Sequence, residues 1–273
     1  MSECKNESHF KNKKTELAEK TSSIVTARNS SIATEQSKFL VAEGSKFFVA
    51  ERSNITVAQR SNITVAERSR SLIVISNPIA IKNEASLINN LCDEGLTLFH
   101  LRKPDSSEEE IKLLMQHINS KHYSKIVFHQ QHQLAKAFGV TRLHFTEMNR
   151  KNQSENNLSD LKNNFTHLST SIHSYKDYKT LSSQFDYTFL GPVFDSISKK
   201  NYKALDIKKD LQNNEKQLTK LIALGGITKN NINEPFTWGF DGAAVLGSIW
   251  ENENPIKEFI QINNACKHCE ITP

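Results

Sequence analysis

The chain has 273 residues, of which 37% are hydrophobic and 24% charged, with a formal net charge of +5 at pH 7. A mean hydropathy of −0.53 is low for a single compact barrel, so part of the chain is not expected to form core. Scattered basic residues argue against a nucleic-acid partner, and no apolar run reaches the roughly 18 residues of a membrane span.

The N-terminal residues lack the apolar region of a secretory signal. Four cysteines, two of them in the C-terminal motif Cys266-Lys-His-Cys269, are too few and too unevenly spaced for a disulfide framework. That motif supplies only three possible metal ligands, Cys266, His268 and Cys269, whereas a structural zinc site needs four, so we interpret its cysteines as free thiols. A reducing, cytoplasmic location is expected.

Residues 1–70 contain an eight-residue repeat, with copies SKFLVAEG, SKFFVAER, SNITVAQR and SNITVAER over 37–68. This period is too short for helix-pair or blade repeats, which need about 20–50 residues. The unit has a β-like apolar centre but lacks the turn chemistry of a hairpin. We therefore expect a poorly ordered, low-complexity extension. A β-solenoid or an oligomerising arm is the alternative, which leaves a homo-oligomer open.

From residue 71 onward, short apolar runs typical of buried strands alternate with segments of helical periodicity. The helices include one that ends at Gly95, one that opens with a Ser107…Glu110 capping box, and a last one from Pro255. This alternation predicts an α/β fold, a (β/α)8 TIM barrel over residues 71–273. The predicted strands are 71–76, 97–102, 125–129, 142–146, 167–173, 187–194, 220–226 and 242–249.

Small, hydroxylated and cationic residues follow the last three predicted strands. The run YTFLGPVF leads into a loop with Ser196, Ser198 and Lys199, and ALGGIT and AVLGSI bring glycines to the next two strand ends. In a parallel barrel these ends meet at one face, and glycine lets backbone N–H groups approach a ligand closely. The three loops predict a site for a small molecule that carries a phosphate.

Six motifs, FHLRKP, LAKAFGVTRLHF, TSIHS, LGPVFDSISKK, IALGGI and GAAVLGSI, occur in the order and spacing of one family. Over roughly residues 71–265 the chain resembles the thiamine phosphate synthase/TenI family. The resemblance implies a phosphate-binding barrel of thiamin biosynthesis with one of two activities. The synthase joins hydroxymethylpyrimidine diphosphate to thiazole phosphate with Mg²⁺. The TenI-type tautomerase shifts a proton on a carboxythiazole phosphate and needs no metal.

Within this resemblance, the residues after the second, third and fourth strands favour the tautomerase. His100 and Arg102 stand where the synthase has Gln-x-Arg-x-Lys, with Lys103 one position early. His129 and Gln130 replace an Asn-Asp pair whose Asp binds Mg²⁺. Asn149 stands near a second Asp ligand, with Glu147 two residues earlier. Because amides are poor substitutes for two carboxylates around Mg²⁺, departure of a diphosphate is expected to be slow.

The resemblance also assigns roles to individual residues. His173, in TSIHS, matches the family's acid/base histidine, and His100 is a second catalytic candidate. No metal site and no cofactor are assigned to a tautomerase, whereas a synthase would need Mg²⁺. The expected ligands are a phosphorylated thiazole and, for a synthase, a pyrimidine diphosphate. Substrate contacts are predicted for Arg102, Lys103, His129, Gln130, Ser196, Ser198 and Lys199, and phosphate contacts for Gly225, Gly226, Gly247 and Ser248.

Three alternatives stay open at this stage. The chain is a divergent synthase if Glu147 or water supplies the missing ligands. It is a non-catalytic sensor if it kept the phosphate contacts and lost turnover. It is a metal hydrolase if histidines near strand ends gather around an ion, although no carboxylate stands at a matching position. The histidines in question are His100, His129, His144 and His173.

Overall fold

The computed structural model describes residues 38–43, 46–51, 70–195, 204–205, 207–212 and 217–267. The chain divides into two units, Met1–Glu67 and Arg68–Pro273. In the first unit, β1 (Lys38–Glu43) and β2 (Lys46–Glu51) pair antiparallel, with Lys38 opposite Glu51. Two adjacent copies of the repeat thus pair with one another, which we did not predict. The boundary at residue 70 and the order of the rest of this segment stay predictions.

The second unit is a closed barrel of parallel strands in the order β10-β3-β4-β5-β6-β7-β8-β9. Each strand lies inside one of the predicted apolar runs, and the predicted TIM barrel is confirmed. The strands are β3 (Ser71–Ile75), β4 (Leu98–Leu101), β5 (Ile126–Phe128), β6 (Arg142–Phe145), β7 (His167–Ile172), β8 (Tyr187–Leu190), β9 (Lys220–Leu224) and β10 (Gly242–Val245).

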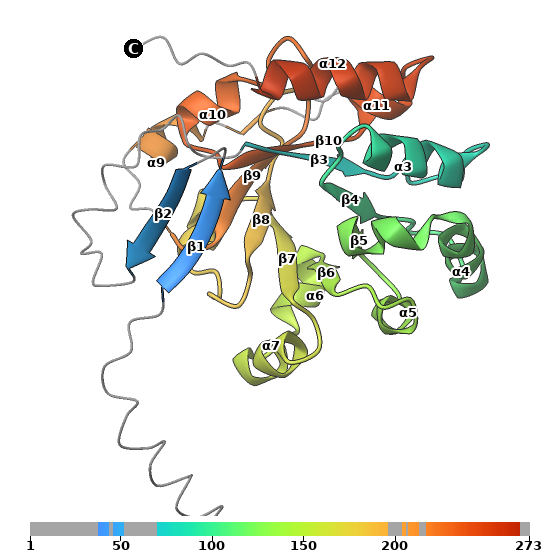
Figure 1. Ribbon diagram of the computed structural model, residues 1–273, viewed down its shortest axis with the longest axis horizontal. Helices are drawn as coiled ribbons and strands as arrows, with labels where there is room; N and C mark the ends of the chain where they lie inside the picture. The colour runs from blue at the N-terminus through green and yellow to red at the C-terminus, as the bar shows by residue number, and fades with distance from the viewer. Residues whose placement is uncertain are drawn as a thin grey trace, which may run out of the picture. The chain divides into compact units, whose positions relative to one another are not determined.

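Helices connect these strands and lie outside the ring that they form (Figure 1). Local signals in the sequence set their ends. Ser107 and Glu110 form the predicted capping box, and Gly95 follows the first helix with a φ of +95°. The helices are α3 (Glu84–Asp93), α4 (Glu108–His117), η2 (Ser120–Lys125, a 3-10 helix), α5 (His132–Ala137), α6 (Glu147–Lys151), α7 (Glu155–Lys162), α8 (Tyr175–Lys179), α9 (Lys208–Gln212), α10 (Glu234–Trp238), α11 (Gly247–Trp250) and α12 (Pro255–Lys267).

Alternate residues of each strand face two different surroundings. On β3, Leu72 and Val74 belong to the core between strands and helices, whereas Ile73 and Ile75 point into the barrel. Inside the barrel, β3, β8, β9 and β10 supply an apolar cluster that includes Phe189 and Ile222. The interior positions of β4 and β6 carry His100 and His144 instead, both almost fully buried. One half of the barrel interior is therefore apolar and the other half polar.

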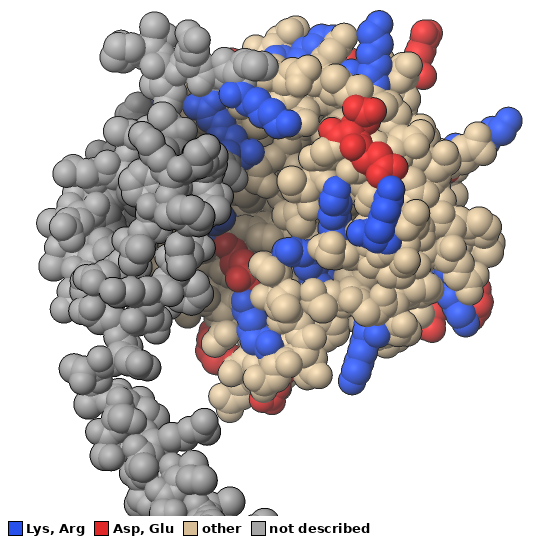
Figure 2. Space-filling view, viewed as in Figure 1, with Lys and Arg blue, Asp and Glu red and all other residues tan. Residues whose placement is uncertain are grey.

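The surface of the described residues shows mixed charge. On the face in Figure 2, lysine and arginine side chains are spread among acidic ones rather than gathered into one stripe. Within the described residues, no helix combines the length and apolar character that crossing a bilayer requires.

Candidate active site

Two adjoining cavities, of about 420 and 360 Å³, open at the carboxyl ends of the strands. Both are lined by Arg102, Leu224 and Leu246, so they form one continuous mouth with Arg102 between its two parts. We call the larger one the cradle cavity, after the glycine loops that line it, and the smaller one the imidazole cavity, after its histidines. Their position is the one at which chemistry is expected in this fold.

One wall of the cradle cavity is the loop after β9, whose main chain packs against the main chain of the loop after β8. Val193 N–H donates to the carbonyl of Leu224, and Phe194 N–H to that of Gly225. A Cβ on Gly226 would lie 2.5 Å from the Asp195 carbonyl oxygen and 2.6 Å from Phe194 Cβ, and its φ is +65°. Only glycine at this position lets the two loops pack so closely, and its main chain lies in the cavity wall.

Gly247 and Ser248 line the same cavity as the first two residues of α11. Because the N–H groups of a first helical turn have no acceptor within the helix, both are available to a ligand. The Ser248 hydroxyl oxygen is also buried without a hydrogen-bond partner in the described structure. These donors suit the oxygens of a phosphate.

The imidazole cavity holds His173 and Glu147 at the ends of neighbouring strands. His173 directly follows β7, and its side chain is 58% exposed. Its Nε2 lies 3.7 Å from Glu147 Oε2, while Lys151 Nζ binds Glu147 Oε1 at 2.6 Å. The mouth thus presents an accessible imidazole beside a carboxylate, with Arg102 on the same wall.

Lys103 does not reach the mouth, contrary to its predicted role as a substrate contact. Its side chain is buried, with Nζ 2.6 Å from Glu84 Oε1 and 2.9 Å from the carbonyl oxygen of Ile79. It lines a separate cavity of about 650 Å³ between α3 and α4. In extended chain, neighbouring residues point to opposite sides, so Lys103 points outward where Arg102 points to the mouth.

The other predicted residues are distributed differently. His100 is fully buried inside the barrel and lines neither mouth cavity, whereas His129 lines the imidazole cavity. Gln130 lines neither, and its Oε1 is buried without a hydrogen-bond partner in the described part of the chain. Ser196, Ser198 and Lys199 lie outside the described residues, so their role stays a prediction.

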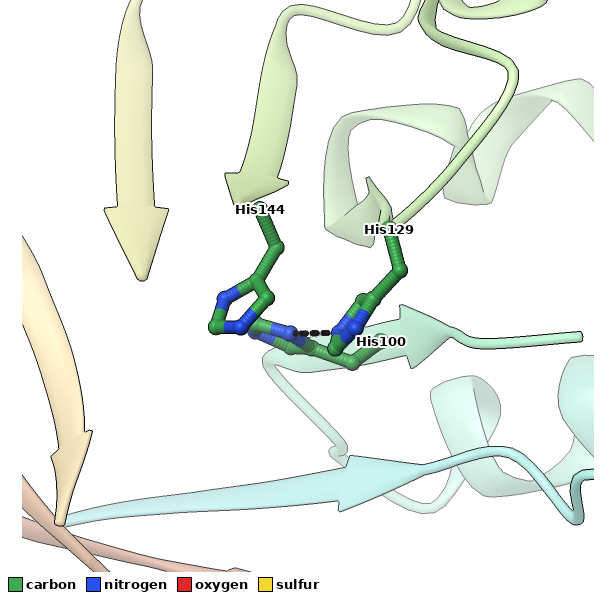
Figure 3. A group of neighbouring side chains, drawn as sticks. All are labelled: His100, His129 and His144. Atoms are coloured by element: carbon green, nitrogen blue, oxygen red, sulfur yellow. Dashed lines mark hydrogen bonds between the residues drawn. The ribbon is translucent and has the colours of Figure 1, made fainter. Parts of the chain in front are cut away.

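His100, His129 and His144 form a cluster inside the barrel (Figure 3). His100 Nδ1 lies 2.8 Å from His129 Nε2, and the rings of His129 and His144 stack at 4.0 Å. His144 Nδ1 and Nε2 lie 2.9 Å from Ser169 Oγ and Ser171 Oγ. Burial, reinforced by neighbouring cationic groups, lowers the pKa of His144 to about 3 and those of His100 and His129 well below 6.5. The three rings are therefore neutral at pH 7.

The cluster does not fit a metal ion well, although its candidate ligand atoms lie within 4.8 Å of one another. Both nitrogens of His100 and both of His144 already have hydrogen-bond partners. The stacked rings of His129 and His144 also cannot direct in-plane lone pairs toward one point. Hydrogen bonds account for these residues without an ion.

A magnesium-diphosphate site fits the described mouth poorly as well. Among the described residues, the carboxylates that line the two cavities are Glu147 and Glu251, and Glu147 already binds Lys151. The positions expected to carry the two aspartates hold Gln130 and the exposed Asn149. Mg²⁺ prefers several anionic oxygens in octahedral geometry, which this set does not offer.

Two groups of site residues were missed from the sequence. Tyr187 places its hydroxyl 2.8 Å from His100 Nε2, although the run YTFL reads as apolar strand. Ser169 and Ser171 hold His144. Their spacing of two in HLSTSI was a usable signal, because polar residues at alternate positions of a buried strand face the barrel interior.

A family model described as thiamine monophosphate synthase matches residues 72–249, more than half of the chain. Thiamine-phosphate synthase of Anoxybacillus flavithermus is 33% identical over 92 residues, which cover 32% of this chain and 42% of that protein. The alignments with the curated relatives thus span less than half of the relatives' own length.

Two solved structures share the fold. Thiamine phosphate pyrophosphorylase from Bacteroides thetaiotaomicron has 25% identity and a TM-score of 0.57, and the match covers 71% of this chain and 96% of that one. The Pyrococcus furiosus protein has 18% identity and the same TM-score, over 73% and 96% of the two chains, which supports the fold alone.

Proposed function

The chain belongs to the thiamine monophosphate synthase family, and we propose that it is a TenI-like tautomerase within it. Its substrate in this proposal is a carboxylated thiazole phosphate, on which it moves a proton. The observation that carries the proposal is the pairing of His173 with Glu147 in the imidazole cavity, next to Arg102 and beside the cradle cavity.

Binding in this proposal uses opposite parts of the mouth. The phosphate is held by the N–H groups of Gly225, Gly226, Gly247 and Ser248, with the loop of Ser196, Ser198 and Lys199 as a further predicted contact. The substrate carboxylate binds Arg102, whose planar guanidinium suits two parallel hydrogen bonds to a carboxylate. The cavities share Arg102, so one small molecule can contact it and the cradle together.

The chemistry then falls to His173. Its imidazole removes a proton from the ring carbon next to the carboxylate, and a proton is added elsewhere on the conjugated system, so that no atoms are gained or lost. Glu147 keeps the ring oriented and stabilises the imidazolium that forms. An imidazole suits this task because its ordinary pKa lies near neutrality.

The second candidate is a divergent synthase, a transferase that joins a pyrimidine diphosphate to thiazole phosphate. The names of the curated relatives favour it, since all three are thiamine-phosphate synthases. This activity would need Mg²⁺, with Glu147 as the carboxylate nearest to the expected position. The donor set in the mouth is the reason that we rank it second.

The two functions separate in one pair of assays on the full chain. Carboxythiazole phosphate is followed by NMR for isomerisation, and pyrimidine diphosphate with thiazole phosphate and Mg²⁺ is followed for thiamine phosphate. We expect isomerisation, with kcat lowered on the order of 10²–10⁴-fold by His173→Asn and little change in KM. His117→Asn, on the outer surface of α4, is the matched control. Rapid formation of thiamine phosphate without isomerisation would overturn the proposal.

A further inference from the structure

A cavity of about 470 Å³ lies at the end of the barrel opposite to the mouth. It is lined by residues that begin strands, among them Ser71, Arg142, Tyr187 and Lys220. Arg142 and Lys220 bring charge to this opening, and Leu218 beside them is 90% exposed. We call it the lower cavity. It gives solvent access to the end of the barrel interior that lies opposite to the mouth.

A line of hydrogen-bonded rings connects this cavity to the mouth. Tyr187, which lines the lower cavity, places Oη 2.8 Å from His100 Nε2. His100 Nδ1 lies 2.8 Å from Nε2 of His129, which lines the imidazole cavity. The remaining nitrogen, His129 Nδ1, has no hydrogen-bond partner among the described residues. The line thus runs from Tyr187, a 7% exposed residue in the wall of the lower cavity, through the fully buried His100 to His129 in the wall of the imidazole cavity.

The line can be hydrogen bonded in two directions. In one, Tyr187 donates to His100 Nε2, His100 Nδ1–H donates to His129 Nε2, and His129 carries its proton on Nδ1. In the other, the two histidines carry their protons on Nε2 and donate toward Tyr187. The phenol proton of Tyr187 then points away from His100. A side-chain hydrogen bond with Ser169 partly offsets the rise of the Tyr187 pKa that burial causes. Both arrangements keep every group neutral and pair every N–H and O–H between the rings.

We propose that Tyr187, His100 and His129 form a proton relay through the barrel, which delivers one proton from solvent at the lower cavity to substrate at the mouth. In one concerted transfer, His129 Nδ1 releases its proton to the substrate while His129 Nε2 accepts the proton of His100 Nδ1. His100 Nε2 takes the phenol proton, and solvent returns a proton to Tyr187. This transfer converts the first arrangement into the second, so each ring loses one proton and gains one. After product release, His129 Nδ1 takes a proton from solvent at the mouth, and the same transfers in reverse restore the first arrangement.

The relay rests on the proposed tautomerase activity and supplies the proton that this activity adds to the substrate. His173 takes a proton from one atom of the substrate, and His129 gives a proton to another, so the isomerisation needs no single group to reach both atoms. His173 then releases its proton to the solvent to which it is exposed. Because burial keeps the relay histidines neutral, the protons have to move together rather than through a resident imidazolium.

A purely structural network predicts something different. Buried imidazoles that only satisfy one another hold one fixed tautomer each, as we infer for His144 between its two serines. Since the Ser169 hydroxyl donates to the carbonyl of Leu143, His144 has to carry its proton on Nδ1. The tautomer states of His100 and His129 therefore separate a relay from a static network.

The first test needs no substrate. Nitrogen NMR of the full chain with 15N-labelled histidine is compared with that of Tyr187→Phe, which removes the phenol and keeps the ring. We expect averaged tautomers for His100 and His129 in the parent, and a shift of both toward Nδ1–H in the variant. Tyr178→Phe is the matched control, because Tyr178 is equally buried and its hydroxyl binds the Thr219 carbonyl away from the relay. Single, unchanged tautomers in parent and variant would overturn the relay.

The second test uses carboxythiazole phosphate in D₂O. We expect Tyr187→Phe to lower kcat on the order of 10²-fold at unchanged KM and to raise the fraction of product that keeps the substrate's own hydrogen. Unchanged rate and deuterium content would overturn the relay even if His173→Asn is inactive. A parent without isomerase activity would overturn the proposed function, while the tautomer measurement still decides the relay.

Discussion

Replacing Lys103 tests how the loop before α3 is held. Lys103→Met keeps the length of the side chain but removes the ammonium group between Glu84 and the Ile79 carbonyl. Both side chains of the ion pair are at most 5% exposed, so the variant leaves a carboxylate buried without its partner. Breaking a buried pair in this way typically costs about 3–5 kcal/mol of unfolding free energy.

The pH dependence of this loss follows from Glu84. Burial raises the pKa of Glu84 above 4.5, and Lys103 lowers it, so the variant has a still higher folded-state pKa. A carboxyl whose pKa is higher in the folded than in the unfolded state destabilises the protein as pH rises above the unfolded value. At about 1.36 kcal/mol per pH unit, the variant loses at most about 3.4 kcal/mol of unfolding free energy between pH 4.5 and 7. The parent loses less over this range, because its Glu84 pKa is raised less.

Urea unfolding of the parent and variants at several pH values between 4.5 and 7.5 measures this loss. We expect Lys103→Met to lose about 3 kcal/mol at pH 7 and much less at pH 4.5. The double variant Lys103→Met, Glu84→Met should fall within about 1.5 kcal/mol of the parent, because no charge is left buried. A single-variant loss that does not depend on pH, or a double variant as unstable as the single one, would refute the reasoning.

Three further experiments have expected outcomes. Gly226→Ala should weaken binding of thiazole phosphate in calorimetry and destabilise the fold in urea, because its Cβ meets main chain. Gly139→Ala, with a φ of +68° but no atom within 4 Å, should cost only about 1–2 kcal/mol, and equal behaviour of the two would contradict this. Ser107→Ala should lose about 1 kcal/mol in urea unfolding through the capping box, and an unchanged midpoint would count against it. The parent purified without chelator should hold no stoichiometric zinc by elemental analysis. One zinc per chain, lost in His144→Gln, would show that the cluster of His100, His129 and His144 is a metal site.

The sequence predicted the barrel well because its signal is local. A strand buried on both faces needs a short apolar run, and glycine, proline or a capping serine marks where it or the next helix ends. The residues at strand ends followed from the same argument, since parallel strands share one face. Arg102, His173 and the glycine loops meet at the mouth for that reason.

Side-chain direction was harder to predict. Lys103 and Arg102 are neighbours in the sequence, yet one points to α3 and the other to the mouth, and only the register of the strand decides between them. His100 stands two residues before Arg102 but lies deeper in the barrel, where a tyrosine from a strand 87 residues later meets it. Such pairings depend on closure of the barrel and leave no mark in a local motif.

The division of the barrel interior has an evolutionary consequence. In the proposed function the loops after β9 and β10 bind phosphate through their main chain, whereas the ends of β4 to β7 carry Arg102, His129, Glu147 and His173. Binding by main-chain groups tolerates side-chain substitutions. The reactive residues of the other half can therefore change during evolution while the ligand stays bound. A barrel that binds phosphate through its main chain can in this way change from bond formation to isomerisation when a few residues on four adjacent strands are replaced.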